Sequence, residues 1–347
     1  MKKINVWKFL RNIWAWIKGL FCKPKPESQP EPTPPVVPEP DPPTVPEPKP
    51  PWFGASVYEL IQQMDQHYTS FLYKLSEAGG NATEIFLIHS HDGNIFQPYS
   101  FDVWKINTPT FNLDVWNENF WNTFKMFLLQ CKDLGIVPFI RIHDFCSIKR
   151  PEIAKFYCYL NNMQGFKSVY DAGLYPYYSR LNARILKELK DTGIEKFFII
   201  PMSECDGERN NVEWFNIWYA ENALLNNWIE QLIISADPKH FDKLKKLECR
   251  LEVHGIADVE DLVTAIQLYG NNIFGNGDGC NGNGIQSYNG YGEPSIDQAI
   301  ELGKYIRNND LFGYIYKARE GYQTRGEVHP ELVKFSALKA LVGENND

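Results

Sequence analysis

The stretch from Ile194 to Arg209, IEKFFIIPMSECDGER, constrains the fold of this chain more than any other. Within it, Lys196 to Met202 is a run of bulky, β-branched and aromatic residues, which predicts a strand buried on both faces. The run ends at Ser203 and Glu204, where the chain becomes polar. In a β/α barrel the carboxyl ends of the strands surround a shared cleft, so Glu204 at such an end is a candidate functional residue. The alternative is that Glu204 only begins a solvated loop.

Short apolar runs alternate with amphipathic helical segments from residue 52 onward, which is the pattern of repeated βα units. Strands are expected at 52–55, 84–91, 136–144, 194–204, 248–255, 271–279 and 311–320, with a further one near 284–288. Helices are expected at 57–78, 115–134, 180–189, 211–235, 239–246, 259–269, 296–307 and 329–341, with loops at 94–112 and 146–178. The sequence therefore predicts an α/β fold, a (β/α)8 TIM barrel over residues 52–347 that an amphipathic helix and a Pro-rich linker precede.

The first part of the chain differs in composition from the rest. Residues 1–22 form a basic amphipathic segment with three Trp, which is typical of a helix that lies in a membrane interface. Docking of this helix onto a larger protein assembly is the alternative. Residues 23–51 are rich in Pro, which excludes helix and sheet and predicts an extended polyproline II linker. We therefore expect a peripheral membrane protein or a component attached to a larger assembly.

Charge and cysteine content limit the partners of the chain. The net charge is −8, so the chain has no overall basic footprint and no nucleic acid partner is expected. Seven Cys without a CxxC pair indicate reduced thiols rather than a disulfide framework or a zinc knuckle, and thus favour a reducing compartment. Aromatic residues make up 14% of the chain, which suits a sugar-stacking cleft and also a tightly packed core.

Polar residues gather at the carboxyl ends of the predicted strands. They are Ser56, His89, His91, Asp92, Arg141, His143, Asp144, Glu204, Asp206, Glu252, His254, Asn276, Asp278, Lys317, Arg319 and Glu320. Cleavage of a glycosidic bond needs two carboxyl groups, one that protonates the leaving group and one that acts as nucleophile or base. Glu204 is the candidate acid/base in this chemistry, and no cofactor and no metal are expected.

Two segments resemble a known family. CKDLGIVPFIRIHDF (131–145) and FFIIPMSECDG (197–207) are similar to the third and fourth units of the clan A, cellulase-like glycoside hydrolases. The resemblance implies a (β/α)8 barrel that acts on a carbohydrate, with an acid/base Glu at the end of strand four and a nucleophile Glu at strand seven. It covers 52–347 as architecture and 131–207 as sequence. The clan usually has Asn before the strand-four Glu, whereas this chain has Ser203, which can still donate a hydrogen bond to a sugar hydroxyl.

The second carboxylate has two candidates. Glu320 ends the clearest late strand, where a side chain is held rigidly, and Glu293 lies in a loop near the expected seventh strand. Glu320 is preferred for this rigidity, whereas the strand-seven position implied by the clan argues for Glu293. The further candidates for contact with the carbohydrate are His91, Trp104, Arg141, His143, Tyr177, Ser203, Asp206, Trp214 and His254.

Two other functions are compatible with the same barrel. The pair His89-x-His91 at a strand end is the arrangement that amidohydrolase-like barrels use for a metal, and His143, Asp144, His254 and Asp278 are candidates to complete such a site. A carbohydrate-binding or scaffolding barrel without catalysis is the third possibility, because fold does not fix function.

Overall fold

The computed structural model describes the globular part of the chain with gaps. The described residues are 50–56, 60–61, 67–88, 96, 98–105, 108–144, 172–203, 233–235, 250–277, 294–317, 322–323, 327–328 and 335–343. The anchor segment 1–22 and the Pro-rich segment up to residue 49 lie outside these ranges.

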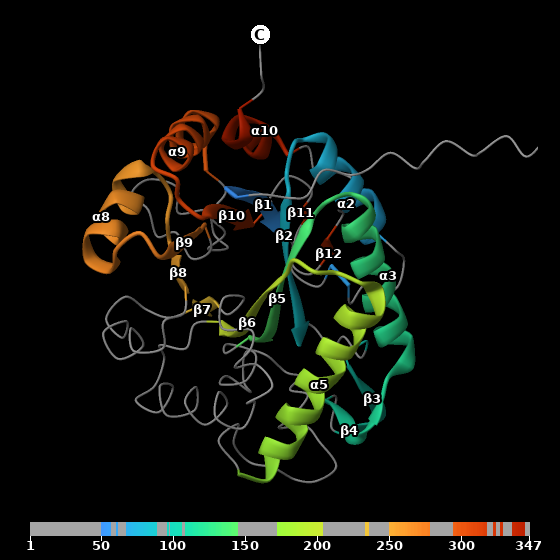
Figure 1. Ribbon diagram of the computed structural model, residues 1–347. Helices are drawn as coiled ribbons and strands as arrows, with labels where there is room; N and C mark the ends of the chain where they lie inside the picture. Colours follow the sequence, from blue (N-terminus) through green and yellow to red (C-terminus); the bar gives the residue numbers. More distant parts are fainter. Residues whose placement is uncertain are drawn as a thin grey trace, which may run out of the picture. The chain divides into compact units, whose positions relative to one another are not determined.

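Eight strands form one parallel sheet in the order β6-β5-β2-β1-β10-β9-β8-β7 (Figure 1). They are β1 (Trp52–Ser56), β2 (Ala82–Ile88), β5 (Val137–Asp144), β6 (Phe198–Ser203), β7 (Ile233–Ser235), β8 (Arg250–His254), β9 (Ile273–Asn276) and β10 (Gly313–Lys317). The first strand pairs in parallel with the last, with Trp52 opposite Gly313, as in a (β/α)8 barrel. The predicted α/β fold is confirmed, and the curled parallel sheet has the strand order of that barrel.

The described helices largely follow the predicted periodicity. They are α2 (His67–Glu77), α3 (Glu118–Asp133), the short 3₁₀ helix η1 (Ala172–Leu174), α5 (Tyr175–Thr192), α8 (Val259–Tyr269), α9 (Ile296–Asn308) and α10 (Ser336–Val342). Side chains of Asn117, Asp258 and Ser295 accept hydrogen bonds from the first turns of α3, α8 and α9, which explains where these helices begin. None of the described helices is both long and apolar enough to cross a membrane.

Strand β7 is an element that the sequence pattern does not predict. A helix was expected to continue through Ser235, but Ile233–Ser235 pairs in parallel with β8. Three residues are too few for a period-two alternation to be visible beside a long helical pattern. Because β7 is the fifth barrel strand, β8 becomes the sixth and β9 the seventh. Residues 284–288, where the seventh strand was expected, lie outside the described residues; among the described strands, β9 holds the seventh place.

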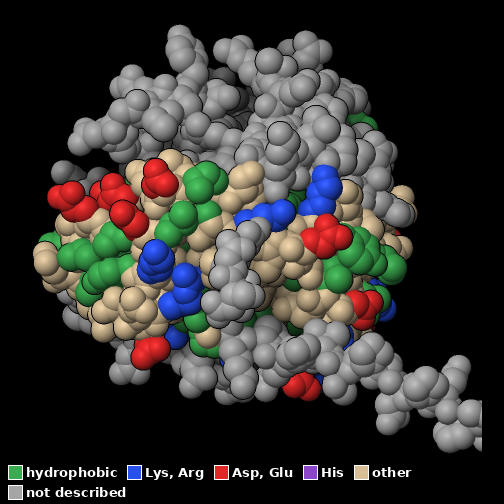
Figure 2. Space-filling model, turned by 90° about the horizontal axis from the view of Figure 1, so that it is seen from above, with side chains coloured by type: hydrophobic (Ala, Val, Ile, Leu, Met, Phe, Trp, Pro, Cys, Tyr) green, Lys and Arg blue, Asp and Glu red, His purple; other side chains and the backbone are tan. Residues whose placement is uncertain are grey.

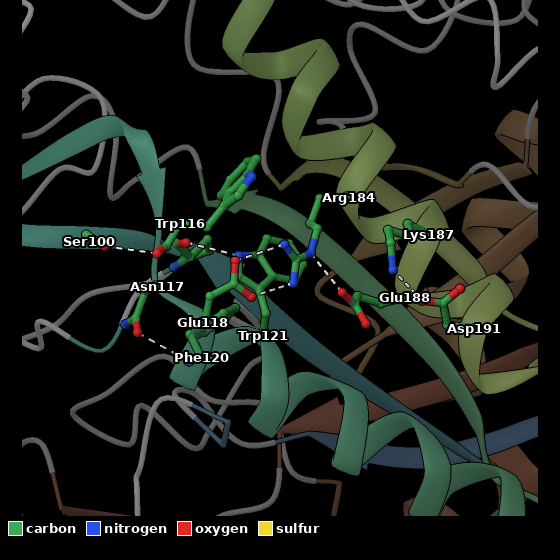
Figure 3. Close-up of polar contacts among 11 residues, drawn as sticks. Ser100, Trp116, Asn117, Glu118, Phe120, Trp121, Arg184, Lys187, Glu188 and Asp191 are labelled. Atoms are coloured by element: carbon green, nitrogen blue, oxygen red, sulfur yellow. Dashed lines mark hydrogen bonds and ion pairs between the residues drawn. The ribbon is translucent and has the colours of Figure 1, made fainter.

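A β-hairpin occupies part of the segment that was expected to be a loop. Strands β3 (Tyr99–Lys105) and β4 (Thr108–Trp116) pair antiparallel between β2 and α3. The ring of Trp116 stacks on Tyr99 at 5.0 Å between centroids, and the Ser100 hydroxyl donates to the Trp116 carbonyl (Figure 3). The alternation of β-branched and aromatic residues in this segment is interrupted by bulges, which hides the two strands in the sequence.

Helices α3 and α5 are joined by one arginine. Arg184 on α5 donates to both carboxylate oxygens of Glu118 on α3, at 2.8 and 3.1 Å, and to Glu188 on its own helix at 2.7 Å. Its guanidinium also lies 5.0 Å from the centroid of the Trp121 ring. Figure 3 shows this side chain between the two glutamates. Arg184 therefore holds helices α3 and α5 together.

The outer surface of the described part has no large apolar patch on any one element. The face in Figure 2 mixes acidic, basic and apolar side chains. The large apolar side chains that are exposed come from different elements, namely Tyr73 on α2, Val115 on β4, Met126 on α3, Leu268 on α8 and Ile296 on α9. Single exposed apolar residues of this kind are ordinary on a protein surface.

Candidate functional site

The inside of the barrel is apolar at its amino-terminal end. One buried cluster fills this end, separate from the larger core between sheet and helices: Trp52, Ala82, Val137, Phe139, Phe198, Ile200, Phe274 and Ile315, with Phe312 packed against it. The rings of Phe139 and Phe274 stack at 4.9 Å, and Phe139 and Phe198 lie 4.7 Å apart. These residues lie early in their strands, so the chain closes this end with aromatic side chains.

The next layer toward the carboxyl ends of the strands is polar. Arg141 on β5 is fully buried and bonds two carboxylates that are themselves buried. Its Nε donates to Glu84 on β2, and its Nη2 donates to Glu252 on β8 at 2.7 Å. Asn276 on β9 donates from its amide nitrogen to Glu252 and to Glu84, the latter at 3.4 Å. We call Glu84, Arg141, Glu252 and Asn276 the interior cluster.

The interior cluster keeps Arg141 charged. Burial by itself would lower the pKa of the guanidinium, but the adjacent carboxylates of Glu252 and Glu84 raise the pKa above its ordinary value. The ring of Phe86 on β2 lies 5.1 Å from the Arg141 guanidinium and covers it. The cation is therefore permanent over the pH range in which a protein stays folded.

Ser56 lies beside the interior cluster. It ends β1, is fully buried, and pairs in register with Glu84 on one side and with Lys317 on the other. Among the described residues, its hydroxyl has no hydrogen-bond partner. A buried hydroxyl without a partner is uncommon, and such groups often mark a place where water or a ligand binds.

Four of the predicted site residues lie in described strands, though only their backbone positions are described. His143 pairs in register with Ile88 and Met202, and the next residue, Asp144, pairs with Ser203. His254 ends β8 opposite Asn276. Trp104 lies in β3 opposite Pro109. The strand ends of β5, β6 and β8 thus bring positions 143, 203 and 254 to the same end of the barrel.

Arg141 and Tyr177 are the predicted site residues whose side chains are described. Arg141 belongs to the interior cluster, where both carboxylates engage it. Tyr177 is half-buried in the first turn of α5, with the Arg180 guanidinium 5.7 Å from its ring. Arg180 also lies 5.4 Å from the Trp116 ring and pairs with Asp114 at 3.2 Å. Arg180 therefore connects α5 to the β3–β4 hairpin, and Tyr177 lies beside its guanidinium.

The remaining predicted site residues lie outside the described part of the chain. They are Glu204, Glu293, Glu320, His91, Asp206 and Trp214, together with His89 and Asp278 of the metal alternative. Glu204 directly follows Ser203, the last residue of β6.

Glu84 is the member of the interior cluster that the strand-end pattern does not predict. It lies in the first half of β2, away from the strand end, whereas Arg141, Glu252 and Asn276 lie near the ends of theirs. A signal was present: Glu84 is the charged residue of the mostly apolar strand β2, and Arg141 is flanked on both sides by apolar residues in β5. Opposite charges at such positions indicate a buried pair, because an unpaired buried charge is costly.

Solved structures with a fold similar to this chain include glycoside hydrolases. A candidate glycoside hydrolase from Bacteroides vulgatus aligns with a TM-score of 0.54 and 13% identity over 83% of this chain, which spans 55% of that protein. A triple variant of an endo-β-1,4-glucanase from Xanthomonas axonopodis pv. citri aligns at 0.51 and 11% identity over 84% of this chain and 99% of its own. A GH5-4 broad-specificity endoglucanase from an uncultured bacterium aligns at 0.52 and 13% identity over 79% and 83%.

Sequence comparison adds no relative: no family model matches the chain, and no curated protein matches it. At these identities the structural likeness shows the fold alone, a (β/α)8 barrel.

Proposed function

We propose that this chain is a glycoside hydrolase that cleaves a polysaccharide or glycan by carboxylate acid/base catalysis. The observation that carries the proposal is the place of Glu204. β6 is the fourth strand of the barrel order, and Glu204 is the residue that follows its end. That is the position of the acid/base in the clan that the sequence resembles. The similar barrels described above include two proteins named as endoglucanases, so β-glucans are the first substrates to test.

Strand alternation supports an inward position for Glu204. Phe198 and Ile200 on β6 belong to the cluster inside the barrel. Side chains on a strand alternate between its two faces, so in an extended strand positions 202 and 204 share the face of residues 198 and 200. We therefore propose that Glu204 faces the opening above the interior cluster.

The second carboxylate remains to be chosen among three residues. The position implied by the clan is the end of the seventh strand, which is β9, and the first acidic residue after its last residue Asn276 is Asp278. Glu293 lies much further along the chain, just before Pro294, and Glu320 follows the eighth strand, β10. We propose Glu320 or Glu293, with Asp278 as the third candidate that the strand order introduces.

The other residues of the proposed site contact the carbohydrate. His143, Ser203 and His254 come from the ends of β5, β6 and β8, the strands that surround the interior cluster. Imidazole and hydroxyl groups at such positions donate and accept hydrogen bonds with sugar hydroxyls. His91, Trp104, Asp206, Trp214 and Tyr177 are further candidates.

The decisive experiment is hydrolysis of soluble β-glucans and xyloglucan by the full chain and by Glu204→Gln. Gln keeps the size and polarity of Glu but has no titrating proton, so we expect a loss of about 100-fold to 10,000-fold in kcat. Lys304→Ala on the outside of α9 is the control. Activity that survives Glu204→Gln removes Glu204 from the mechanism, and activity lost on EDTA treatment supports the metal site at His89 and His91 instead.

Chemical rescue identifies the second carboxylate. The variants Glu320→Ala, Glu293→Ala and Asp278→Ala are assayed with an activated aryl glycoside, with and without azide. In a retaining enzyme, azide replaces the missing nucleophile and yields a glycosyl azide, whereas loss of a sugar-binding carboxylate gives no such product. Tight sugar binding without turnover under any of these conditions supports a non-catalytic barrel.

We further propose that residues 1–22 attach the barrel to a membrane or to a larger assembly, with residues 23–51 as spacer. Basic and aromatic residues in one amphipathic segment support membrane attachment. A fusion of residues 1–51 to a soluble reporter is expected to sediment with anionic liposomes. Absence of sedimentation favours docking onto protein.

A further inference from the structure

The interior cluster connects opposite sides of the barrel. Arg141 on β5 reaches Glu84 on the neighbouring strand β2 and also Glu252 on β8. In the sheet order β5 and β8 are separated by β2, β1, β10 and β9, so the second contact crosses the interior. Asn276 on β9 bonds both carboxylates and completes the connection.

Packing alone does not explain a polar layer at this place. The layer toward the amino-terminal end is filled by Trp52, Phe139, Phe198 and Phe274, which shows that this barrel can be filled with rings. Burying one guanidinium and two carboxylates carries a desolvation cost, and replacing buried ion pairs by uncharged residues of similar size is often neutral or stabilising. A buried ion pair fixes one geometry through directed hydrogen bonds, whereas an aromatic ring in the same place does not.

The position of the cluster indicates what this geometry serves. Arg141 and Glu252 lie two residues before His143 and His254, which is one step along the same face of each strand. β5 also pairs with the end of β6, where Asp144 is opposite Ser203 and Glu204 follows. A shift of β5 against β8 therefore moves the ends of β5, β6 and β8 relative to one another.

We propose that Arg141 is a positioning residue: through Glu84 and Glu252 it fixes the ends of β5 and β8 across the barrel opening, and so holds positions 143, 254 and 204 in the arrangement that the reaction needs. The inference rests on the proposed function for its catalytic consequence and on the geometry of the cluster for its structural one. Arg141 does not bind the substrate in this account.

The test replaces all charges of the cluster together. The variant Arg141→Met/Glu84→Gln/Glu252→Gln keeps the side-chain volumes but leaves no buried charge. We expect it to fold with a near-UV circular dichroism spectrum like that of the parent. We expect kcat to fall about 100-fold, because small displacements of reacting groups cost that much, with KM changed much less.

A second readout is independent of any activity. The imidazole resonances of His143 and His254 are assigned with single His→Gln variants, and those of His67 on α2 serve as reference. In the triple variant we expect the chemical shifts of the His143 and His254 imidazoles to change and those of His67 to remain the same. If the full chain hydrolyses no glycan, the proposed function fails, while these resonances still decide whether the cluster positions the strand ends.

The chain offers a matched control. Arg184 also binds two glutamates, Glu118 and Glu188, but between helices α3 and α5 rather than inside the sheet, with Glu188 buried and Glu118 60% exposed. The variant Arg184→Met/Glu118→Gln/Glu188→Gln removes the same groups from there and should change neither kcat nor the two imidazole sets.

Two outcomes overturn the proposal: unchanged kcat together with unchanged resonances in the folded triple variant, or equal effects of the control. Should the triple variant fail to fold, Arg141→Lys decides by the same readouts, because Lys keeps the charge but lacks the guanidinium fork that spans two carboxylates. Parent-like resonances in Arg141→Lys contradict the proposal, and moved resonances support it.

Discussion

The Arg141 guanidinium on β5 and the Glu252 carboxylate on β8 lie 2.7 Å apart, although four strands separate β5 from β8 along the sheet. A contact of this kind requires a curled sheet whose inner face closes on itself. It also places both charges out of reach of water, with the two side chains fully buried. The consequence for stability is specific, because each partner depends on the other.

Removal of Arg141 alone should destabilise the fold strongly. Arg141→Met leaves the carboxylates of Glu84 and Glu252 buried without their cation, and breaking a buried pair in this way costs about 3–5 kcal/mol. Urea denaturation at pH 7 measures the loss. The triple variant with Glu84→Gln and Glu252→Gln should recover most of it; a triple variant as unstable as Arg141→Met would show that the guanidinium contributes by packing.

Gly303 on α9 has no room for a side chain. A Cβ built at this residue would lie 1.9 Å from the Leu341 carbonyl oxygen of α10, so the two helices must separate in Gly303→Ala. We expect a loss of about 1–3 kcal/mol, the usual cost of overpacking. Thermal unfolding measures it, with the exposed neighbour Lys304→Ala as control. A melting temperature equal to that of the control would contradict this close approach.

The first turn of α9 is stabilised by a capping box. The Ser295 hydroxyl accepts from the Gln298 amide at 3.3 Å, and the Gln298 side chain accepts from the Ser295 amide at 3.0 Å. Ser295→Ala should cost about 1 kcal/mol, because an N-terminal amide loses its acceptor. Ser295→Asp retains an acceptor and should stay near the parent. Denaturation midpoints of the three proteins test the prediction, and equal midpoints for Ala and Asp would refute it.

The pair between Arg184 and Glu118 should make a small contribution that depends on pH. The hydrogen bond from Arg184 lowers the pKa of Glu118. A carboxyl whose pKa is lower in the folded state stabilises the fold above its unfolded pKa, and the contribution disappears as the pH falls through the folded value.

Glu118→Gln should therefore cost at most about 1 kcal/mol at pH 7, since the glutamate is 60% exposed and screened by solvent. The difference from the parent should shrink as the pH falls through the folded pKa of Glu118, which lies below its ordinary value. Urea denaturation over a series of acidic pH values measures it, with Glu301→Gln on α9 as control for the substitution itself. A difference in the free energy of unfolding that increases as the pH falls would contradict the prediction.

Much of the fold follows from local pattern, and the exceptions have physical reasons. The helices at 259–269 and 296–307 end where their caps and last periodic residues predict. β7 escapes prediction because three residues next to a helical pattern carry no period of their own. The hairpin of β3 and β4 is not predicted because bulges interrupt its alternation. The start of α5 at Tyr175 is not predicted because it lies in a Tyr-rich segment without a helical apolar stripe.

The candidate site was predictable only at the level of strand ends. Arg141, Glu252 and Asn276 stand at or near such ends, and the rule that polar ends of parallel strands share one cleft finds them. Their mutual contacts depend on curvature and on the order of eight strands, which local sequence does not encode. Because the sequence pattern does not predict the short strand β7, it counts β9 as the sixth strand instead of the seventh. The second carboxylate was therefore sought in a later loop.

The aromatic filling at the amino-terminal end has a consequence for any polymer that this protein processes. Trp52, Phe139, Phe198 and Phe274 close the ring from below, with the Phe312 ring packed beneath them and Arg250 over its face at 3.7 Å. Under the proposed function, a chain of sugars therefore has no exit on that side. We expect it to lie across the opposite end of the barrel, so the width of that end, rather than the depth of the barrel, determines how many sugar units bind at once.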